Sequence, residues 1–370
     1  MKEYFLELLR AGLWSCSPSV ELFENASYLD WEEIHYLAKG QAVTGIVFDG
    51  MEKLPVSIRP PRGLLMQWFA EVNAIERQNQ KLNSTLVELF RLCLHHGVSP
   101  LLLKGQGIAQ SYEKPDHRMC GDIDLYLGID GCKVIDPVLE EITGMEADLS
   151  DGDSTFVWNQ VVIESHKTLT HLFNPVSHRK QKRILRKHLD EKEFFRIFGE
   201  AEIRVPAPGM DVLFIFLHIA KHFMVEGIGL RQICDWARIL YISKGKYDPE
   251  RLKKELDDLK LTRLANVFGA LMIRHLGFPV SFFPWDIPEK DAENVNFLLE
   301  EILISGNFGK NRNLKGKAPK KIFFRKYYTF QNLCRRSFYL LKLCPSEALC
   351  LPFKFFVNQI SQMICKKSPL

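Results

Sequence analysis

The stretch that decides the fold is residues 101–128, LLLKGQGIAQSYEKPDHRMCGDIDLYLG. A short apolar run ends in Lys104-Gly105, and two aspartates one residue apart follow in a strand-like segment. Because side chains at i and i+2 of a strand point to the same face, Asp122 and Asp124 would lie about 6–7 Å apart along the backbone. Such carboxylates repel by roughly 3 kcal/mol at about 5–6 Å and an effective dielectric of about 20, unless a cation sits between them. The expected cation is Mg²⁺ or Mn²⁺, which prefer oxygen ligands and work beside phosphates.

The acid pair needs support from its surroundings. Acidic residues number 45 of 370, so acid-x-acid triplets arise about five times by chance in such a chain. Support comes from the apolar run that stops at Gly105, from Arg118, from Gly121 directly before the pair, and from a third acid further along the chain.

Length and composition are those of an ordinary globular protein. The 370 residues, 46% of them hydrophobic, predict two or three domains. The amphipathic start MKEYFLELLRAGLW indicates a helix rather than a signal peptide. No uninterrupted run of about 18 apolar residues occurs, so we expect no transmembrane segment. The nine cysteines form no CxxC pair, which favours reduced thiols and a cytoplasmic location.

The net charge of +4 hides an asymmetry between the body and the end of the chain. From Lys310 onward there are fourteen Lys or Arg against one acid, Glu347, so this tail carries about +13 and the preceding body about −9. Aromatic residues are interleaved with the charges, which would suit contact with RNA or with an anionic membrane. A helical appendage that packs on the acidic body is the alternative.

Hydrophobic periodicity predicts an α/β (α+β) fold, with a small mixed-sheet core flanked by N-terminal and C-terminal helical regions. A long helix is expected between the Pro60-Pro61 break and Gly97. The charged segment 177–195 indicates a solvated connector or exposed helix, with phosphate binding by its arginines as the alternative. The predicted parts are an N-terminal helical region (1–97), the core (98–175), the charged connector and a hairpin (176–208), a second helical domain (209–305) and the basic tail (306–370).

The third acid is Glu164, in the segment 156–169, FVWNQVVIESHKTL. We expect this segment to form one strand, with Glu164 and His166 on one face and Val161 on the other. If that strand pairs beside the two aspartates, the three carboxylates could hold two divalent ions and orient a nucleoside triphosphate. The alternative is an exposed strand glutamate balanced by His166 or by the lysine that follows it.

Five motifs together resemble one family. They are LLLKGQGI, HRMCGDIDLYL, VIESHKTL, LHIAKHF and LRQICDWARIL, in this order along the chain. The chain therefore resembles nucleotidyltransferases of the polymerase-beta-like superfamily that carry a KG…R…GDID block, an IELH strand, and helices with LHLAKH and LRWLVDIA. The resemblance covers roughly residues 30–245.

The resemblance implies roles for particular residues. Its implied catalytic and metal-binding residues are Asp122, Asp124 and Glu164, and its implied nucleotide- or phosphate-binding residues are Lys104, Gly105, Gln106, Arg118 and Lys221. A glycine at the turn lets the backbone approach a phosphate closely, and the following helix would offer free N–H groups. Many superfamily members have Gly-Ser at this turn, whereas this chain has Gly105-Gln106. Lys104 or Arg118 could supply the missing contact.

The LHIAKHF and LRQICDWARIL motifs place polar residues on helical faces. His218, Lys221 and His222 stand at i, i+3 and i+4, and Arg231 and Asp235 are four residues apart. The resemblance implies that His218, His222 and Asp235 face the substrate. A buried polar network that ties the helices together is an equal alternative, and a zinc site is disfavoured because no HExxH glutamate is present.

These inferences predict an enzyme that transfers a nucleoside monophosphate from a nucleoside triphosphate to an acceptor and releases pyrophosphate, with Mg²⁺ or Mn²⁺ as cofactor. Glu164 would also be a candidate base. Removal of either aspartate is expected to abolish turnover without destabilising the fold. The acceptor could be a small molecule, a modified peptide, a protein or RNA. The alternative is an inactive nucleotide- or partner-binding protein on the same fold, which the missing Gly-Ser signature would allow.

Overall fold

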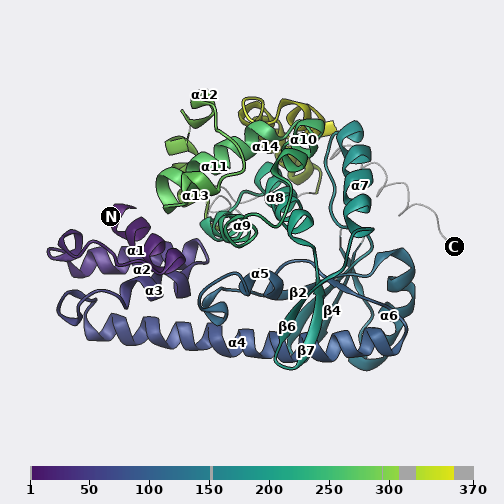
Figure 1. Ribbon diagram of the computed structural model, residues 1–370, viewed down its shortest axis with the longest axis horizontal. Coiled ribbons are helices and arrows are strands. Elements are labelled where there is room, and N and C mark those ends of the chain that lie inside the picture. Colours follow the sequence, from purple (N-terminus) through teal and green to yellow (C-terminus); the bar gives the residue numbers. More distant parts are fainter. Residues whose placement is uncertain (1, 151–152, 294, 308–321, 354–370) are drawn as a thin grey trace.

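A computed structural model describes the chain except for residues 1, 151–152, 294, 308–321 and 354–370, and the side chains at 149–150 and 322–328 (Figure 1). A five-stranded sheet and a two-stranded sheet lie between one long helix and a layer of shorter helices. The strands are β1 (Leu101–Leu102), β2 (Asp122–Tyr126), β3 (Asp148–Ser150), β4 (Asp153–Trp158), β5 (Val161–His166), β6 (Phe194–Phe198) and β7 (Ala201–Val205). The helices are α1 (Lys2–Trp14), α2 (Tyr28–Gly40), α3 (Thr44–Met51), α4 (Arg62–His95), α5 (Gln106–Ala109), α6 (Gly128–Thr143), α7 (Pro175–Leu189), α8 (Pro208–Val225), α9 (Leu230–Ile242), α10 (Pro249–Asp258), α11 (Thr262–Leu276), α12 (Glu289–Ala292), α13 (Val295–Ser305) and α14 (Ile322–Leu340).

The long helix α4 confirms the expected helix between the proline pair and Gly97. Its 34 residues extend about 51 Å at 1.5 Å per residue. Near its start, Trp68 is fully buried in the main core with α2 and α3, whereas Leu86 and Leu89 belong to a second core beneath the sheet. Figure 1 shows α4 running below both the N-terminal helices and the strands. The helix thus fixes the N-terminal region relative to the sheet.

The main sheet has the strand order β1-β2-β5-β4-β3, in which only β2 and β5 are parallel. Ile123 and Leu125 of β2 are buried with Ile163 of β5 and with α4. The mixed sheet flanked by helices confirms the predicted fold class.

The segment 156–169 is a hairpin and not the single strand that its pattern predicts. β4 and β5 pair antiparallel across Asn159 and Gln160, which have φ of 52° and 59°. Two consecutive residues with positive φ form a tight hairpin turn, usually signalled by glycine, which is missing here. The alternation within β5 is unaffected, so Glu164 still lies on the face opposite the buried Val161.

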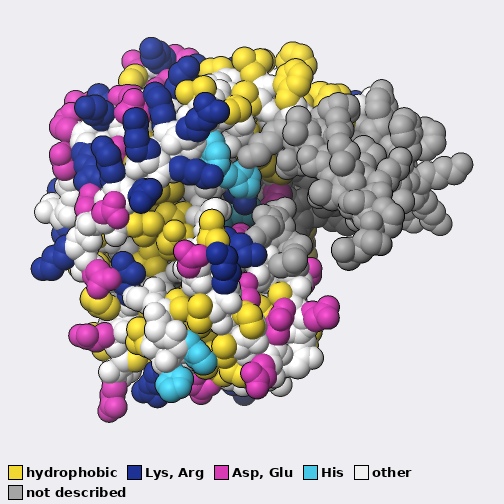
Figure 2. Space-filling model, turned by 90° about the vertical axis from the view of Figure 1, so that its right-hand side faces the viewer, with side chains coloured by type: hydrophobic (Ala, Val, Ile, Leu, Met, Phe, Trp, Pro, Cys, Tyr) yellow, Lys and Arg dark blue, Asp and Glu magenta, His cyan; other side chains and the backbone are white. Residues whose placement is uncertain are grey.

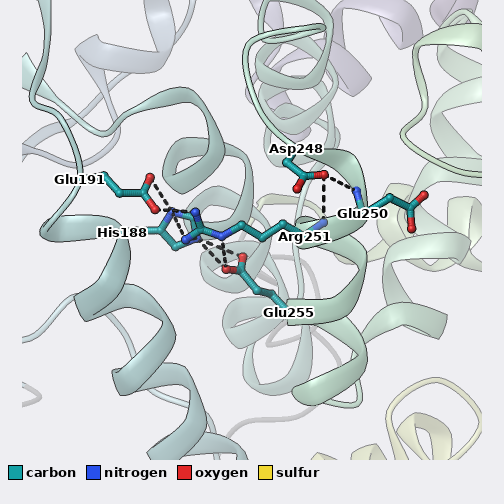
Figure 3. A network of polar contacts seen from close by, with 6 residues as sticks. All are labelled: His188, Glu191, Asp248, Glu250, Arg251 and Glu255. Carbon is teal, nitrogen blue, oxygen red and sulfur yellow. Dashed lines mark hydrogen bonds and ion pairs between the residues drawn. The ribbon is translucent and has the colours of Figure 1, made fainter.

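The charged segment after β5 forms the helix α7, which packs on α10. In Figure 3, His188 of α7 lies against Arg251 and Glu255 of α10. The His188 Nε2 atom is 3.0 Å from a Glu255 carboxylate oxygen, and Arg251 Nε donates to the same carboxylate at 2.9 Å. Asp248 caps α10 by accepting from the N–H groups of its first turn. The face of α7 opposite these contacts is exposed.

The helix α8 is the centre of the main core. Phe214, Phe216 and Phe223 of this helix are almost fully buried, and Phe216 packs on Trp236 of α9. By length and composition alone α8 could cross a membrane, although 67% of its window is buried inside the protein. Asp211, Lys221 and other polar residues interrupt the apolar sequence of α8, so this helix contains no uninterrupted apolar run.

The C-terminal part is described only in segments. α14 packs on α8, and Arg336 of α14 contacts the ring of Phe223. Most of the residues that give the tail its charge lie outside the described residues, so the expected RNA or membrane contact stays a prediction. The cysteines within the described part are all free thiols.

Candidate active site

The aspartates and the third acid lie on neighbouring parallel strands. The register pairs Asp124 of β2 with Glu164 of β5 and Asp122 with Val162. Asp124 is 1% exposed, and Asp122 and Glu164 are half-buried on the same face of the sheet. The strand of Glu164 therefore pairs beside the strand of the two aspartates, as the sequence predicted.

Two cations neutralise Asp124. Lys104 Nζ and His166 Nε2 each lie 2.8 Å from Asp124 Oδ1. The other ring nitrogen of His166 is 2.9 Å from Asp153 Oδ2. Burial alone would raise the pKa of Asp124, but the Lys104 charge and the His166 hydrogen bond outweigh it and hold that pKa below its usual range. Burial alone would lower the pKa of His166, but hydrogen bonds to both aspartates raise it to about 9.

The other two carboxylates are poised differently. Burial, and then the charge of Asp124, raise the pKa of Glu164 to about 7. The charge of Asp124, and then burial, raise the pKa of Asp122. A carboxylate cluster with such pKa values gains stability when a cation enters or a proton binds. Because Asp124 compensates two buried cations, its removal should cost stability, unlike removal of Asp122.

The residues present fit a divalent ion. Ligand atoms of Asp124, Glu164 and His166 lie within 4.8 Å of one another. Asp124 Oδ2 is buried and has no hydrogen-bond partner among the described residues, so an oxygen lone pair is free for a ligand. Carboxylates suit Mg²⁺ and Mn²⁺, and an imidazole ligand shifts the preference toward Mn²⁺. Asp122 is not part of this three-residue group. Asp122 and Asp124 line the cavity described next, whereas Glu164 and His166 are not among its lining residues.

A cavity of about 280 Å³ opens beside the carboxylates. It lies between the turn after β1, the strand β2, and the helices α8 and α9. Its charged and ionisable lining residues are Lys104, Arg118, Cys120, Asp122, Asp124, His218, Arg231 and Asp235. Cations and acids thus face one small space, as a site for a phosphorylated ligand and a metal ion requires.

Arg118 and Asp235 form a buried ion pair at the cavity wall. Arg118 Nε donates to Asp235 Oδ1 at 2.7 Å, and its Nη2 atom donates to Oδ2 at 2.8 Å. Arg118 Nη1 donates to Gly105 O at 3.1 Å, and the Tyr112 hydroxyl donates to Asp235 Oδ1 at 2.8 Å. Gly105 has φ of +55°, a conformation that favours glycine. The pair therefore anchors the Gly105 turn to α9.

Comparison with protein families agrees with this geometry. A family model described as an uncharacterised nucleotidyltransferase matches residues 27–277. The chain belongs to this nucleotidyltransferase family. The match runs from α2 to the end of α11 and so contains the whole cavity wall formed by the sheet, α8 and α9. Searches of curated proteins and of solved structures gave no significant match.

The structure places the other predicted residues of this nucleotidyltransferase as follows. His218 lines the cavity, and burial, followed by the charge of Lys104, lowers its pKa well below the ordinary value. Gln106 is 1% exposed and donates to Asn79, so its side chain is held in the protein interior. Lys221 and His222 are not among the lining residues, and His222 Nδ1 is 3.0 Å from Glu226.

The structure also bears on the roles expected for the Gly105 turn and for the two histidines of α8. The helix after Gly105, α5, has only four residues, and the Gly107 N–H donates to Lys104 O. It therefore offers fewer free N–H groups than expected. No group of three potential metal ligands in the described part of the chain includes His218 or His222.

Sequence reasoning missed two residues that face the site. His166 contacts Asp124 directly, yet the sequence showed it only as a neighbour of Glu164. Arg231 Nη1 donates to Met119 O at 2.9 Å, whereas its Nε atom is buried and has no partner within the described structure. Arg231 is thus a cation with an unused donor at the cavity wall. Its spacing of four residues from Asp235 was the available signal.

Proposed function

We propose that the protein is a metal-dependent nucleotidyltransferase of the polymerase-beta-like type, which moves a nucleoside monophosphate from a nucleoside triphosphate to an acceptor. The pairing of Asp124 with Glu164 on adjacent parallel strands carries the proposal, with the cationic cavity beside them. The family match supports nucleotidyl transfer in general.

Asp122, Asp124 and Glu164 are the proposed metal ligands. His166 lies in the same group, but it can bind the ion only after it loses the proton that it directs at Asp124. The proposed ions are Mg²⁺ or Mn²⁺. A bound divalent ion neutralises the triphosphate and stabilises the attacking and leaving oxygens. The free Oδ2 atom of Asp124 supports this assignment.

The protein's own groups position the reactants. Lys104 and Arg231 present cationic donors to the cavity and would bind the triphosphate oxygens. Arg118 holds the Gly105 turn in place through its bond to the Gly105 carbonyl. In the transfer step an acceptor oxygen bonds to the α-phosphorus, and the bond from that phosphorus to pyrophosphate breaks. The acceptor proton would pass to the Glu164 carboxylate, which is the proposed base of this step.

The test is pyrophosphate release with each of the four nucleotides and Mg²⁺ or Mn²⁺, with and without cell extract as a source of acceptor. Asp122→Asn and Glu164→Gln should lower turnover by about 100-fold or more. Both replacements relieve repulsion, so the fold should be retained. Glu202→Gln, at an exposed carboxylate of β7, is the matched control and should retain full activity.

Full activity of Asp122→Asn would refute the assignment. Nucleotide binding without pyrophosphate release under any of these conditions would favour the inactive binding protein instead. We propose a cytoplasmic location, supported by the free thiols, and contact of the basic tail with RNA or an anionic membrane, supported by its charge.

A further inference from the structure

The helix α7 has two opposite faces. Its buried residues Ser177, Gln181, Ile184, Leu185 and His188 follow helical spacing and pack into the protein. On the other side, five exposed residues are all cationic, and the exposed Val176 precedes them. We call these five the cationic stripe, and its members are Arg179, Lys182, Arg183, Arg186 and Lys187. They stand at i, i+3, i+4, i+7 and i+8, so they share one face that extends about 12 Å.

The charges of the stripe are not compensated. α7 contains no acidic residue, and within the described residues none of the five cations forms an ion pair. The neighbouring Lys180 does so, with Asp258. The basic tail supplies only one acid, Glu347, whose carboxylate accepts from the backbone N–H groups of Phe173 and Asn174. Like charges three and four residues apart destabilise a helix, so the stripe is costly unless an anion binds it.

The stripe lies beside the proposed active site. β5, which carries Glu164, leads through residues 167–174 directly into α7. Tyr126 follows Asp122 and Asp124 on the same face of β2, and burial raises its pKa while the charge of Arg186 partly offsets this rise. In Figure 1, α7 stands above the ends of these strands. Figure 2 looks onto this side and shows Lys and Arg side chains gathered in its upper left part.

We propose that the cationic stripe binds the phosphate backbone of a single-stranded polynucleotide, whose end reaches the carboxylates as the acceptor. This inference rests on the proposed nucleotidyl transfer. A polynucleotide carries one charge at every residue, so the stripe of about 12 Å would contact about three consecutive phosphates. An anionic membrane fits less well because Ile184 and Leu185 of α7 are buried, which leaves Val176 as the one large apolar side chain that this helix exposes for entry into a bilayer.

The experiment is fluorescence anisotropy of a labelled single-stranded oligouridylate with the full-length protein, in EDTA and without nucleotide. The test variant is Arg179→Gln, Arg183→Gln, Arg186→Gln. The matched control removes three exposed arginines of α4, by Arg62→Gln, Arg77→Gln and Arg91→Gln, and so has the same net charge. α4 lies on the opposite side of the molecule (Figure 1).

The wild-type protein and the α4 variant should bind with a common salt dependence between about 50 and 200 mM salt. The α7 variant should bind at least about tenfold more weakly, with the slope of log K against log salt reduced by about two. Equal losses in both variants, no binding by the wild type at low salt, or α7-dependent binding of phosphatidylserine vesicles but not of the oligonucleotide would each overturn the inference.

The binding test is independent of catalysis. Binding is measured in EDTA and without nucleotide, so it does not require transfer. Stripe-dependent binding without pyrophosphate release would refute the proposed function alone. Pyrophosphate release with another acceptor, without oligonucleotide binding, would refute this inference alone.

Discussion

Replacement of Asp235 by alanine tests whether the Arg118–Asp235 pair is structural or faces the substrate. Arg118 and Asp235 are only 3% and 4% exposed. The replacement leaves two guanidinium donors and the Tyr112 hydroxyl without their carboxylate acceptor. Removal of one partner of a buried pair costs about 3–5 kcal/mol. We therefore expect a loss of about 3–5 kcal/mol in the free energy of unfolding and a fall of roughly 4–6 °C in Tm.

Urea denaturation followed by tryptophan fluorescence measures this loss, with Glu202→Ala as the exposed control. The double variant Arg118→Met, Asp235→Leu replaces both charges by apolar groups and should lie within about 2 kcal/mol of the wild type. The losses of stability in the single variants Arg118→Met and Asp235→Leu would then not add up to the loss in the double variant. A double-mutant cycle measures this difference. The reasoning fails if Asp235→Ala changes stability by less than about 1 kcal/mol or if the double variant loses the sum of the single losses.

Two further predictions concern contacts made by residues of the N-terminal region. Burial would lower the pKa of His117, but its hydrogen bond to Asp49 and further contacts raise it. Its stabilising contribution should be complete below a pH of about 6.5 and disappear as the pH rises through the folded-state pKa. His117→Gln should therefore lower Tm more at acidic than at alkaline pH, and an equal loss at both would contradict this. Gly12→Ala should destabilise by more than about 3 kcal/mol, since its Cβ would lie 1.7 Å from the Ile46 carbonyl oxygen. Gly40→Ala, with no atom within 4 Å of its Cβ, is the control, and equal unfolding midpoints of the two variants would refute the close α1–α3 packing.

The sequence allowed prediction of the elements whose signals are local. The proline pair and Gly97 marked the ends of α4 closely, and the alternation around Asp122 and Asp124 located β2. The hairpin turn between β4 and β5 could not be predicted from the sequence, because Asn159 and Gln160 adopt positive φ without a glycine to signal the turn. Tertiary contacts of the flanking strands impose this conformation.

The residues of the site were likewise predictable from the sequence only where their signal is local. The periodicity of β5 put Glu164 on one face, but only strand pairing decided that this face meets Asp124. The bonds from Lys104 and His166 to Asp124 and the role of Arg118 depend on contacts between distant parts of the chain.

The sequence by itself indicated the nucleotidyltransferase family, which the family match confirms, because the acid pair, the third acid and the order of the five motifs are local patterns. The tertiary structure decided how each charge is used. It turned Arg118 and Asp235 into a buried anchor, left the Arg231 Nε donor unpaired at the cavity, and exposed the cationic stripe beside the carboxylates. The physical reason is that the role of a charged side chain depends on its burial and partners, which arise from contacts distant in sequence.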